Sequence, residues 1–270
     1  MSVKFGDQRL VRPDVGGAHR ALYRAMGIPD PAHWLHFKYF ERALGLLDVR
    51  APERILDAGC GAGDYSFHLA RLFPAAKVLS VDINEELLAR NREVARRLGI
   101  QNIEFDRIDL TRLDMPETFD FIVSIDVLEH VEPQDQAFAN LARSLRPGGS
   151  AFYHVPTIRE VPVPFSARLQ GFHDWAHEEH IADDLNHHEV DEAVRRSGLE
   201  IVDSRRTFGW YTGELATSLF TLPFADTTAN RILQAVAAPV CRVLAAADSL
   251  GLDSTRYAVG VCARRPHAAA

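Results

Sequence analysis

Three closely spaced glycines form the feature of the sequence with the clearest chemical potential. The stretch Ile55–Asp64 reads ILDAGCGAGD and places Gly59, Gly61 and Gly63 between an apolar run and a helical pattern. Glycine permits positive φ and lets a ligand lie against bare backbone, and open α/β sheets bind ligands at the carboxyl ends of their strands. We therefore predict a ligand-binding turn here. Asp57, low in the loop, either braces the turn or reaches an ammonium group of the ligand.

The spacing of the glycines separates two classes of ligand. A dinucleotide site has the pattern G-x-G-x-x-G, but here the third glycine comes one residue early and Asp64 takes its position. An acidic residue at a helix N-terminus repels a pyrophosphate. Asp82 ends the next apolar run, nineteen residues after Gly63, where its carboxylate can accept both ribose hydroxyls. The pattern favours a zwitterionic nucleoside without phosphates.

Alternating strands and helices are predicted to position this turn. Strands are expected at Arg54–Ala58, Lys77–Asp82, Asn102–Asp106, Phe119–Ile125 and Ser150–Val155, helices at Tyr65–Leu72, Glu85–Leu98 and Gln134–Leu145, and a turn at Pro147–Gly149. This alternation implies right-handed crossovers and helices on both faces of the sheet. The predicted fold class is α/β, with a doubly wound, mostly parallel sheet.

Further segments flank this core. Helices are predicted at 18–26 and 32–47, where Trp34, Phe37, Tyr39 and Phe40 either close a lid over the site or pack the core. A helix at Glu189–Ser197, a strand at Glu200–Arg206, a helical excursion at Tyr211–Leu250 and an edge strand at Tyr257–Cys262 follow the core. We divide the chain into an N-terminal helical lid (1–50), a cofactor-binding core (51–155), a substrate-side insertion with the rest of the core (156–210), a helical cap (211–250) and a last strand with its tail (251–270).

Six ordered motifs give the chain a family resemblance. They are LDAGCGAG at 56–63, VLSVDI at 78–83, IDL at 108–110, FDFIV at 119–123, VLEHV at 127–131 and LRPGG at 145–149. In this order and spacing, the chain resembles a class I S-adenosylmethionine-dependent methyltransferase, of the small-molecule, type 11-like kind. The resemblance covers roughly 51–155 and is weaker at 189–206 and at the last strand. It implies a Rossmann-like fold and S-adenosylmethionine as cofactor.

The resemblance also implies roles for individual residues. Gly59, Gly61 and Gly63 face the methionine part of the cofactor. Cys60 lies in the same loop and is counted with these cofactor-binding residues; its own side chain is expected to be a small buried filler and not a nucleophile. Asp82 binds the ribose hydroxyls. Around the adenine, Ile83 packs on the ring, Asp109 accepts from the amino group, and Ile108 or Leu110 lies beside it. Asp126 and Val127 line the methionine side and the entry to the substrate pocket. Asp57 and Asp109 have a simpler alternative, as capping residues of their loops.

Histidines are the candidates for a catalytic base, because a hydroxyl acceptor must lose its proton and histidine titrates near neutral pH. His130 follows the fourth predicted strand, and His154 lies near the end of the fifth. His173, His177 and His180 are spaced four and three apart, so they share one face of a helix. They are expected at the substrate, with a solvated face or a zinc site as alternatives. No metal is predicted, because no cysteine pair or strong metal motif accompanies them.

Composition restricts the acceptor. The chain has 270 residues and a net charge of −7, and no Asn-Pro-Pro-Tyr motif follows the fourth strand, so a nucleic-acid acceptor is not expected. The apolar residues of 211–250 can roof a hydrophobic pocket, form a dimer interface, rest on a membrane surface or pack the core. We expect methyl transfer to a small hydrophobic or amphiphilic molecule, with oxygen favoured over carbon or nitrogen. The alternatives are a non-catalytic binding or scaffold module and, less favoured, a nicotinamide oxidoreductase.

Location is indicated by three features. The charged N-terminus lacks the apolar segment of a signal peptide. The most apolar run, Ile232–Cys241, is too short to cross a bilayer. Three widely spaced cysteines give no disulfide framework. We therefore expect a cytoplasmic protein with no transmembrane segment.

Overall fold

The computed structural model describes residues 5–12, 16–17, 20–21, 24, 31–157, 185–209, 239–240, 243, 246–247 and 256–267. Seven strands form one sheet: β1 (Arg54–Ala58), β2 (Lys77–Asp82), β3 (Ile103–Arg107), β4 (Phe119–Ile125), β5 (Leu145–Pro156), β6 (Glu200–Gly209) and β7 (Arg256–Arg264). The helices are α2 (Pro31–Leu46), α3 (Asp64–Leu72), α4 (Glu85–Leu98), α5 (Gln134–Ser144) and α7 (His187–Arg196). Three short 3₁₀ turns complete the described elements: η1 (Asp7–Leu10), η2 (Leu110–Arg112) and η3 (Leu128–His130).

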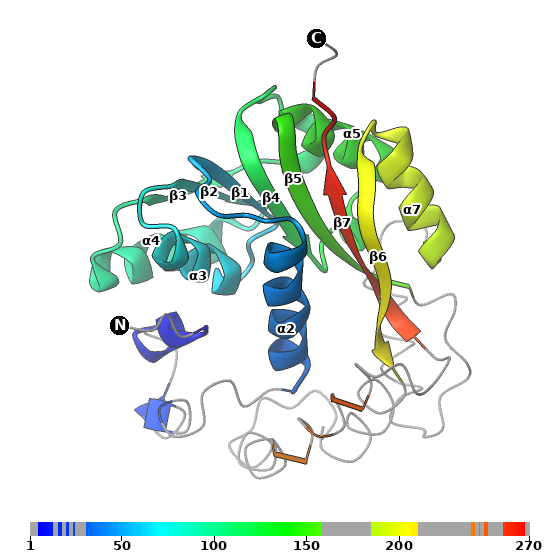
Figure 1. The fold of residues 1–270 in the computed structure, drawn as a ribbon. Coiled ribbons are helices and arrows are strands. Elements are labelled where there is room, and N and C mark those ends of the chain that lie inside the picture. The colour runs from blue at the N-terminus through cyan, green and yellow to red at the C-terminus, as the bar shows by residue number, and fades with distance from the viewer. Residues whose placement is uncertain are drawn as a thin grey trace.

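The strand order across the sheet is β3-β2-β1-β4-β5-β7-β6 (Figure 1). The pairs from β3 to β5 are parallel, and β7 runs antiparallel to both β5 and β6. The prediction of a mostly parallel α/β sheet is confirmed. The chain leaves β1 toward β2 on one side of the sheet and leaves β4 toward β5 on the other side. The loops after these two neighbouring strands therefore diverge, and sheets of this kind bind ligands in the crevice between such loops.

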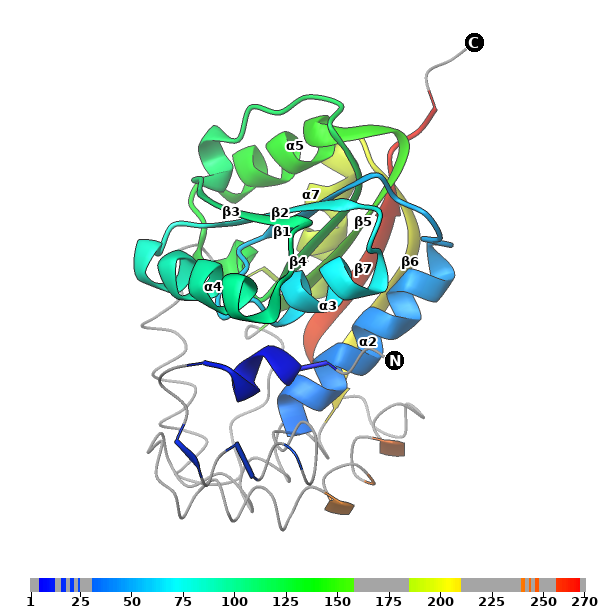
Figure 2. The ribbon, with the colours of Figure 1, turned by 90° about the vertical axis from the view of Figure 1, so that its left-hand side faces the viewer.

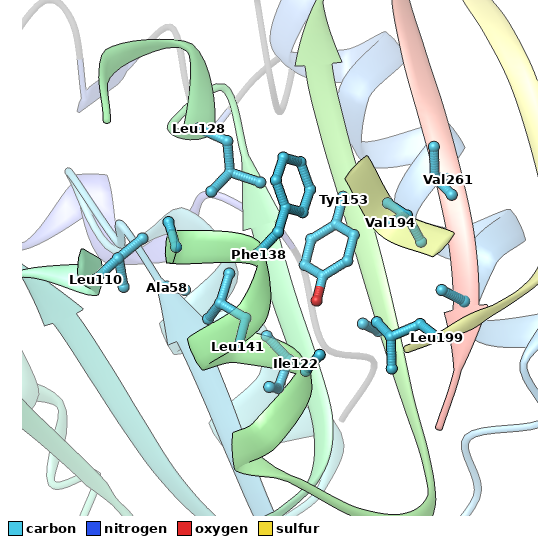
Figure 3. Close-up of a cluster of buried hydrophobic side chains, with 14 of the residues drawn as sticks. Ala58, Leu110, Ile122, Leu128, Phe138, Leu141, Tyr153, Val194, Leu199 and Val261 are labelled. Carbon is cyan, nitrogen blue, oxygen red and sulfur yellow. The ribbon is translucent and has the colours of Figure 1, made fainter. Parts of the chain in front are cut away.

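Helices cover both faces of the sheet (Figure 2). Helices α5 and α7 lie on one face, and α2, α3 and α4 lie on the other. Each face has its own apolar core. On the first face, Phe138 and Leu141 of α5 pack against the sheet beside Val194 of α7 (Figure 3). The rings of Phe138 and Tyr153 meet edge to face at 5.5 Å, an arrangement that aromatic pairs prefer. This packing joins α5 and α7 to the same face of the sheet.

The last strand differs from its prediction. It was expected at the sheet edge, but β7 lies between β5 and β6, and β6 is the edge strand. Every residue of β7 from Ala258 to Ala263 is buried. A continuous apolar run is typical of a strand covered on both faces, which agrees with the inner position of β7.

The turn predicted at Pro147–Gly149 is also wrong. These residues belong to β5, and the register of β4 against β5 shifts between Phe119 and Phe121, which marks a β-bulge. Gly148 takes a positive φ of 81° there, and its N–H donates to the carbonyl of Arg265 at 2.9 Å. The Pro-Gly-Gly sequence therefore bends a strand instead of ending it.

Helix α2 packs firmly on the second face of the sheet. Phe40 is fully buried, and Phe37 stacks on Phe5 with ring centroids 4.2 Å apart. These two rings thus belong to the core packing that the sequence left as the alternative to a lid. Most of the helix predicted at 18–26, most of the excursion at 211–250 and the segment 158–184 lie outside the described residues. Among the helices that are described, none combines the length and apolar character needed to cross a membrane.

Candidate functional site

The glycine turn joins β1 to α3 and is held by backbone hydrogen bonds. The N–H groups of Gly59 and Cys60 both donate to the carbonyl of Val81 in β2, at 2.9 and 2.8 Å. Gly59, Gly61 and Gly63 have φ values of 82°, 48° and 79°. A Cβ on Gly59 would lie 2.3 Å from a γ-carbon of Val127. Both the backbone conformation and the space therefore require glycine at position 59, whereas a Cβ on Gly61 would meet no atom within 4 Å.

Asp82 lies at the carboxyl end of β2 and faces this turn. One oxygen of its carboxylate accepts from the N–H of Gly61 at 2.8 Å, and the other from the N–H of Asn84 at 2.9 Å. Each oxygen keeps a further lone pair, so the carboxylate can still accept from two hydroxyls. Asn91 of α4, buried in the structure, donates to the carbonyl of Gly61 at 2.9 Å. Asn91 was not among the residues predicted from the sequence, where its only signal is a polar residue on the apolar face of its helix.

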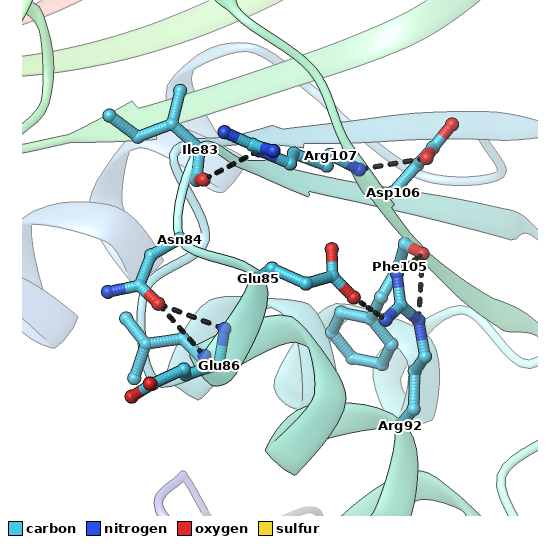
Figure 4. A network of polar contacts seen from close by, with 9 residues as sticks. Ile83, Asn84, Glu85, Glu86, Arg92, Phe105, Asp106 and Arg107 are labelled. Atoms are coloured by element: carbon cyan, nitrogen blue, oxygen red, sulfur yellow. Dashed lines mark hydrogen bonds and ion pairs between the residues drawn. The ribbon is translucent and has the colours of Figure 1, made fainter.

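Ile83 is presented to solvent beside Asp82. Its side chain is 67% exposed, an unusual state for a large apolar residue. The carbonyl of Ile83 accepts from Nε of Arg107 at 3.1 Å, and the following Asn84 caps the N-terminus of α4 (Figure 4). The backbone under Ile83 is therefore fixed, and its side chain is free to act as the predicted adenine platform.

The three residues predicted around the adenine, Ile108, Asp109 and Leu110, follow β3 and differ from one another in burial. Asp109 accepts from both the N–H and the hydroxyl of Thr111 and caps η2. These hydrogen bonds lower the pKa of Asp109. Leu110 is buried in the first core cluster, whereas Ile108 is half-buried at its border. Of the two residues predicted beside the adenine ring, Ile108 is thus the better placed.

Asp57 is buried beneath the turn and accepts a hydrogen bond from the hydroxyl of Ser66. Burial raises the pKa of Asp57 to about 7 against the lowering effect of Ser66, and the negative charge of Asp82 adds to the rise. Cys60 is also buried, and burial strongly raises the pKa of its thiol. A thiol with a raised pKa is a poor nucleophile, which supports the role of Cys60 as a small filler.

Tyr65, on the first turn of α3, has a buried hydroxyl with no hydrogen-bond partner among the described residues. Burial raises the pKa of this hydroxyl, and the negative charges of Asp126, Asp64 and Asp57 raise it further. An unpaired buried donor is costly, and a net negative surrounding attracts a cation. Bare backbone, a free acceptor pair on Asp82 and this orphaned hydroxyl together fit the zwitterionic sulfonium cofactor expected from the sequence.

The N-terminal segment reaches the same region. Gln8 and Arg9 of η1 both hydrogen-bond the carboxylate of Asp64, the first residue of α3, and η1 lies beneath that helix (Figure 2). Although burial alone would raise it, the pKa of Asp64 is lowered, because the Arg9 guanidinium stabilises the charged form. Residues this far apart in sequence give no local signal of pairing.

A second polar cluster lies at the carboxyl end of β4. Asp126 has one carboxylate oxygen 2.7 Å from Nδ1 of His154 in β5 and the other 2.9 Å from Nε2 of His36 in α2. Nε2 of His154 lies 2.9 Å from the hydroxyl of Thr207 in β6. The sequence pointed to Asp126 and His154 separately, but His36 was missed among the aromatic residues of its helix. We call His36, Asp126 and His154 the two-histidine cluster.

The histidines proposed as bases are placed as follows. His130 ends η3 with an exposed side chain, and its Nε2 lies 3.7 Å from the buried carboxylate of Glu129. His173, His177 and His180 lie outside the described residues. His36 and His154, by contrast, share the carboxylate of Asp126 at the carboxyl end of β4.

Comparisons with known proteins agree with this geometry. Residues 55–149 match the family described as a methyltransferase domain. The chain is 28% identical over 185 residues to a ubiquinone biosynthesis O-methyltransferase of Xanthomonas euvesicatoria, covering 66% of this chain and 75% of that protein. It is 34% identical over 118 residues to a ubiquinone/menaquinone biosynthesis C-methyltransferase of Ectopseudomonas oleovorans, covering 43% of this chain and 69% of that protein. Other curated relatives are matched over smaller shares of their own length, 30% in one case and 20% in another.

A solved structure shows the same fold. The crystal structure of a putative sarcosine dimethylglycine methyltransferase from Galdieria sulphuraria superposes with a TM-score of 0.58 at 19% identity, covering 87% of this chain and 84% of that one. At this identity the similarity concerns the fold alone. Together with the sequence matches and the fit of the turn, these findings show that the chain belongs to the class I S-adenosylmethionine-dependent methyltransferases, enzymes whose cofactor is S-adenosylmethionine.

Proposed function

We propose that the protein transfers the cofactor's methyl group to a hydroxyl of a small hydrophobic or amphiphilic molecule. The choice of oxygen rests on the two-histidine cluster at the carboxyl end of β4. This cluster lies close to the glycine turn, because Asp126 directly precedes Val127, whose side chain packs against Gly59. An amine acceptor needs little beyond desolvation, whereas a hydroxyl must lose a proton. A carboxylate shared by two imidazoles is suited to that task.

The cofactor and the protein have different roles in this reaction. S-adenosylmethionine, when bound, supplies a methyl group on a good leaving group. The chain holds the nucleoside with Asp82 and the glycine turn, aligns the acceptor oxygen, and manages the proton at the two-histidine cluster. Such alignment contributes a large part of the rate in a displacement of this kind. His130, which is exposed on η3, stays a candidate for contact with the acceptor, as do His173, His177 and His180.

The preference for an apolar acceptor rests on the surroundings of His36. The ring of Phe208 lies 4.4 Å from that of His36, and Phe208 packs with Leu35, Trp34 and Tyr39 in a small apolar cluster. Aromatic and aliphatic side chains around a few polar groups are typical of small-molecule sites. The acidic balance of the chain argues against a nucleic-acid acceptor. Contact with a membrane surface and a homodimer stay predictions.

Matched acceptors test the proposal. Alkyl-chain phenols and anilines of the same length are incubated with the full chain and labelled S-adenosylmethionine, and methylated products are identified by mass spectrometry. We expect the phenol to be methylated and the aniline to react weakly. Asp126→Asn should lower the phenol rate by about 100-fold or more, in the range that proton-transfer groups contribute. Methylation of the anilines alone would refute the preference for oxygen, and cofactor binding without any product would favour the non-catalytic alternative.

A further inference from the structure

We propose that the two-histidine cluster binds one divalent first-row transition-metal cation. His36, Asp126 and His154 each offer one ligand atom, and these atoms all lie within 4.8 Å of one another. Two imidazoles and one carboxylate form a donor set that suits Zn²⁺, Fe²⁺, Co²⁺ or Mn²⁺ better than Mg²⁺ or Ca²⁺. The three residues come from α2, the end of β4 and β5, so packing of separate elements brings the set together.

His154 has the support that a metal-binding histidine requires. Its Nδ1 faces Asp126, and its other nitrogen, Nε2, lies 2.9 Å from the hydroxyl of Thr207. Histidine ligands of metals usually have their second nitrogen anchored in this way, which fixes the ring orientation. The ring is also buried, with that of Tyr39 stacked at 6.3 Å and that of Phe208 edge-on at 5.6 Å. Its direction is thus fixed before any ligand binds.

The other side of the cluster is open. The side chains of Asp126 and His36 are 35% and 16% exposed. Three protein ligands with accessible sides are typical of a catalytic metal site, whereas structural sites are closed by a fourth ligand. Asp126 also has a φ of 54°, a conformation that is costly for a residue other than glycine and that clusters at functional sites. The carboxylate of Asp126 lies between the two imidazoles.

The role of the cation rests on the proposed function. A hydroxyl oxygen of the acceptor would bind the cation, and its proton would leave to water, because a divalent cation lowers the pKa of a bound hydroxyl. A lone pair of this oxygen then forms the new O–CH₃ bond. The C–S bond breaks, and its electron pair stays on sulfur, which becomes a neutral thioether. No oxidant or reductant is needed.

Cobalt titration tests the site without any acceptor. The full chain is treated with EDTA, dialysed free of chelator and titrated with Co²⁺, whose visible absorption reports coordination by protein ligands. We expect one equivalent to bind and Zn²⁺ to displace it. His36→Ala and Asp126→Asn should each weaken binding by more than about 100-fold, and Thr207→Val by about 10- to 100-fold. His188→Ala removes a histidine that is 77% exposed on α7 and should leave binding unchanged.

The competing arrangement is a metal-free one, in which both imidazoles donate to the carboxylate. Absence of Co²⁺ and Zn²⁺ binding to the folded wild-type chain, or equal binding to His36→Ala, would overturn the proposal. If a variant does not fold, the ring ¹⁵N signals of the wild type decide, because Zn²⁺ should shift those of His36 and His154 and leave that of His188 in place. Methylation by chelated, metal-free protein would refute the role of the cation and leave the proposed function intact. Metal binding without phenol methylation would leave the metal site standing, but it would refute the proposed function and with it the role of the cation.

Discussion

Asp57→Asn is expected to change how stability depends on pH. In the folded protein, burial raises the pKa of Asp57 from its ordinary value of 3.8 to about 7. The native state therefore binds more protons than the unfolded state between these two values, and stability falls as the pH rises through this window. The contribution of Asp57 is favourable to folding below about pH 4 and is fully lost above about pH 7. Asparagine does not titrate, so it removes this dependence.

The magnitude follows from the two pKa values. A difference of about three pKa units corresponds to about 4 kcal/mol at full ionisation. Between pH 5 and pH 8 the change is smaller, about 2–3 kcal/mol, because at pH 5 the unfolded carboxyl is already largely ionised. The asparagine amide that replaces the carboxyl can still accept from the hydroxyl of Ser66. Any packing penalty of the amide is the same at both pH values, so it cancels from the comparison.

Urea unfolding of the cofactor-free protein, followed by tryptophan fluorescence, measures the effect. The free energy of unfolding of Asp57→Asn minus that of the wild type should increase by about 2–3 kcal/mol from pH 5 to pH 8. Asp114→Asn, which changes an exposed carboxylate, is the matched control and should show no such increase. An equal difference at both pH values would show that Asp57 is ionised in the folded protein throughout, and would refute the reasoning.

Three further predictions concern the same region. Gly59→Ala should destabilise the protein by about 2–4 kcal/mol, through its positive φ and the clash with Val127; adding Val127→Ala should recover part of this loss in urea unfolding, and no recovery would contradict the clash. Asp82→Ala should weaken S-adenosylmethionine binding by about 10- to 100-fold in calorimetry, because charge-assisted hydrogen bonds to the ribose are lost; unchanged affinity would remove Asp82 from the site. Arg9→Ala should lower the free energy of unfolding by about 3 kcal/mol, because the buried carboxylate of Asp64 loses the cation that lies closest to it. Arg9→Ala combined with Asp64→Asn should destabilise the protein less than Arg9→Ala alone.

Local patterns were sufficient for most of the core. The predicted bounds of β1, β2, β4 and α4 agree with the structure residue for residue, because each combines a regular apolar period with clear end signals such as Asn84 and Gly99. Lateral order was not encoded in this way. The place of β7 inside the sheet depends on its pairing with both β5 and β6, and these strands come from distant parts of the chain.

The sequence by itself was sufficient to predict the family, the glycine turn and the carboxylate at the end of β2, because local motifs of a few consecutive residues signal each of them. Only the tertiary structure decided which side chains face each other across the site. Arg9 meets Asp64, and His36 meets Asp126 and His154, through the packing of η1 and α2 against the strands. These partners lie on separate elements, so no spacing along the chain could reveal them. Burial then set the pKa of Asp57, since desolvation depends on everything packed around the carboxyl group.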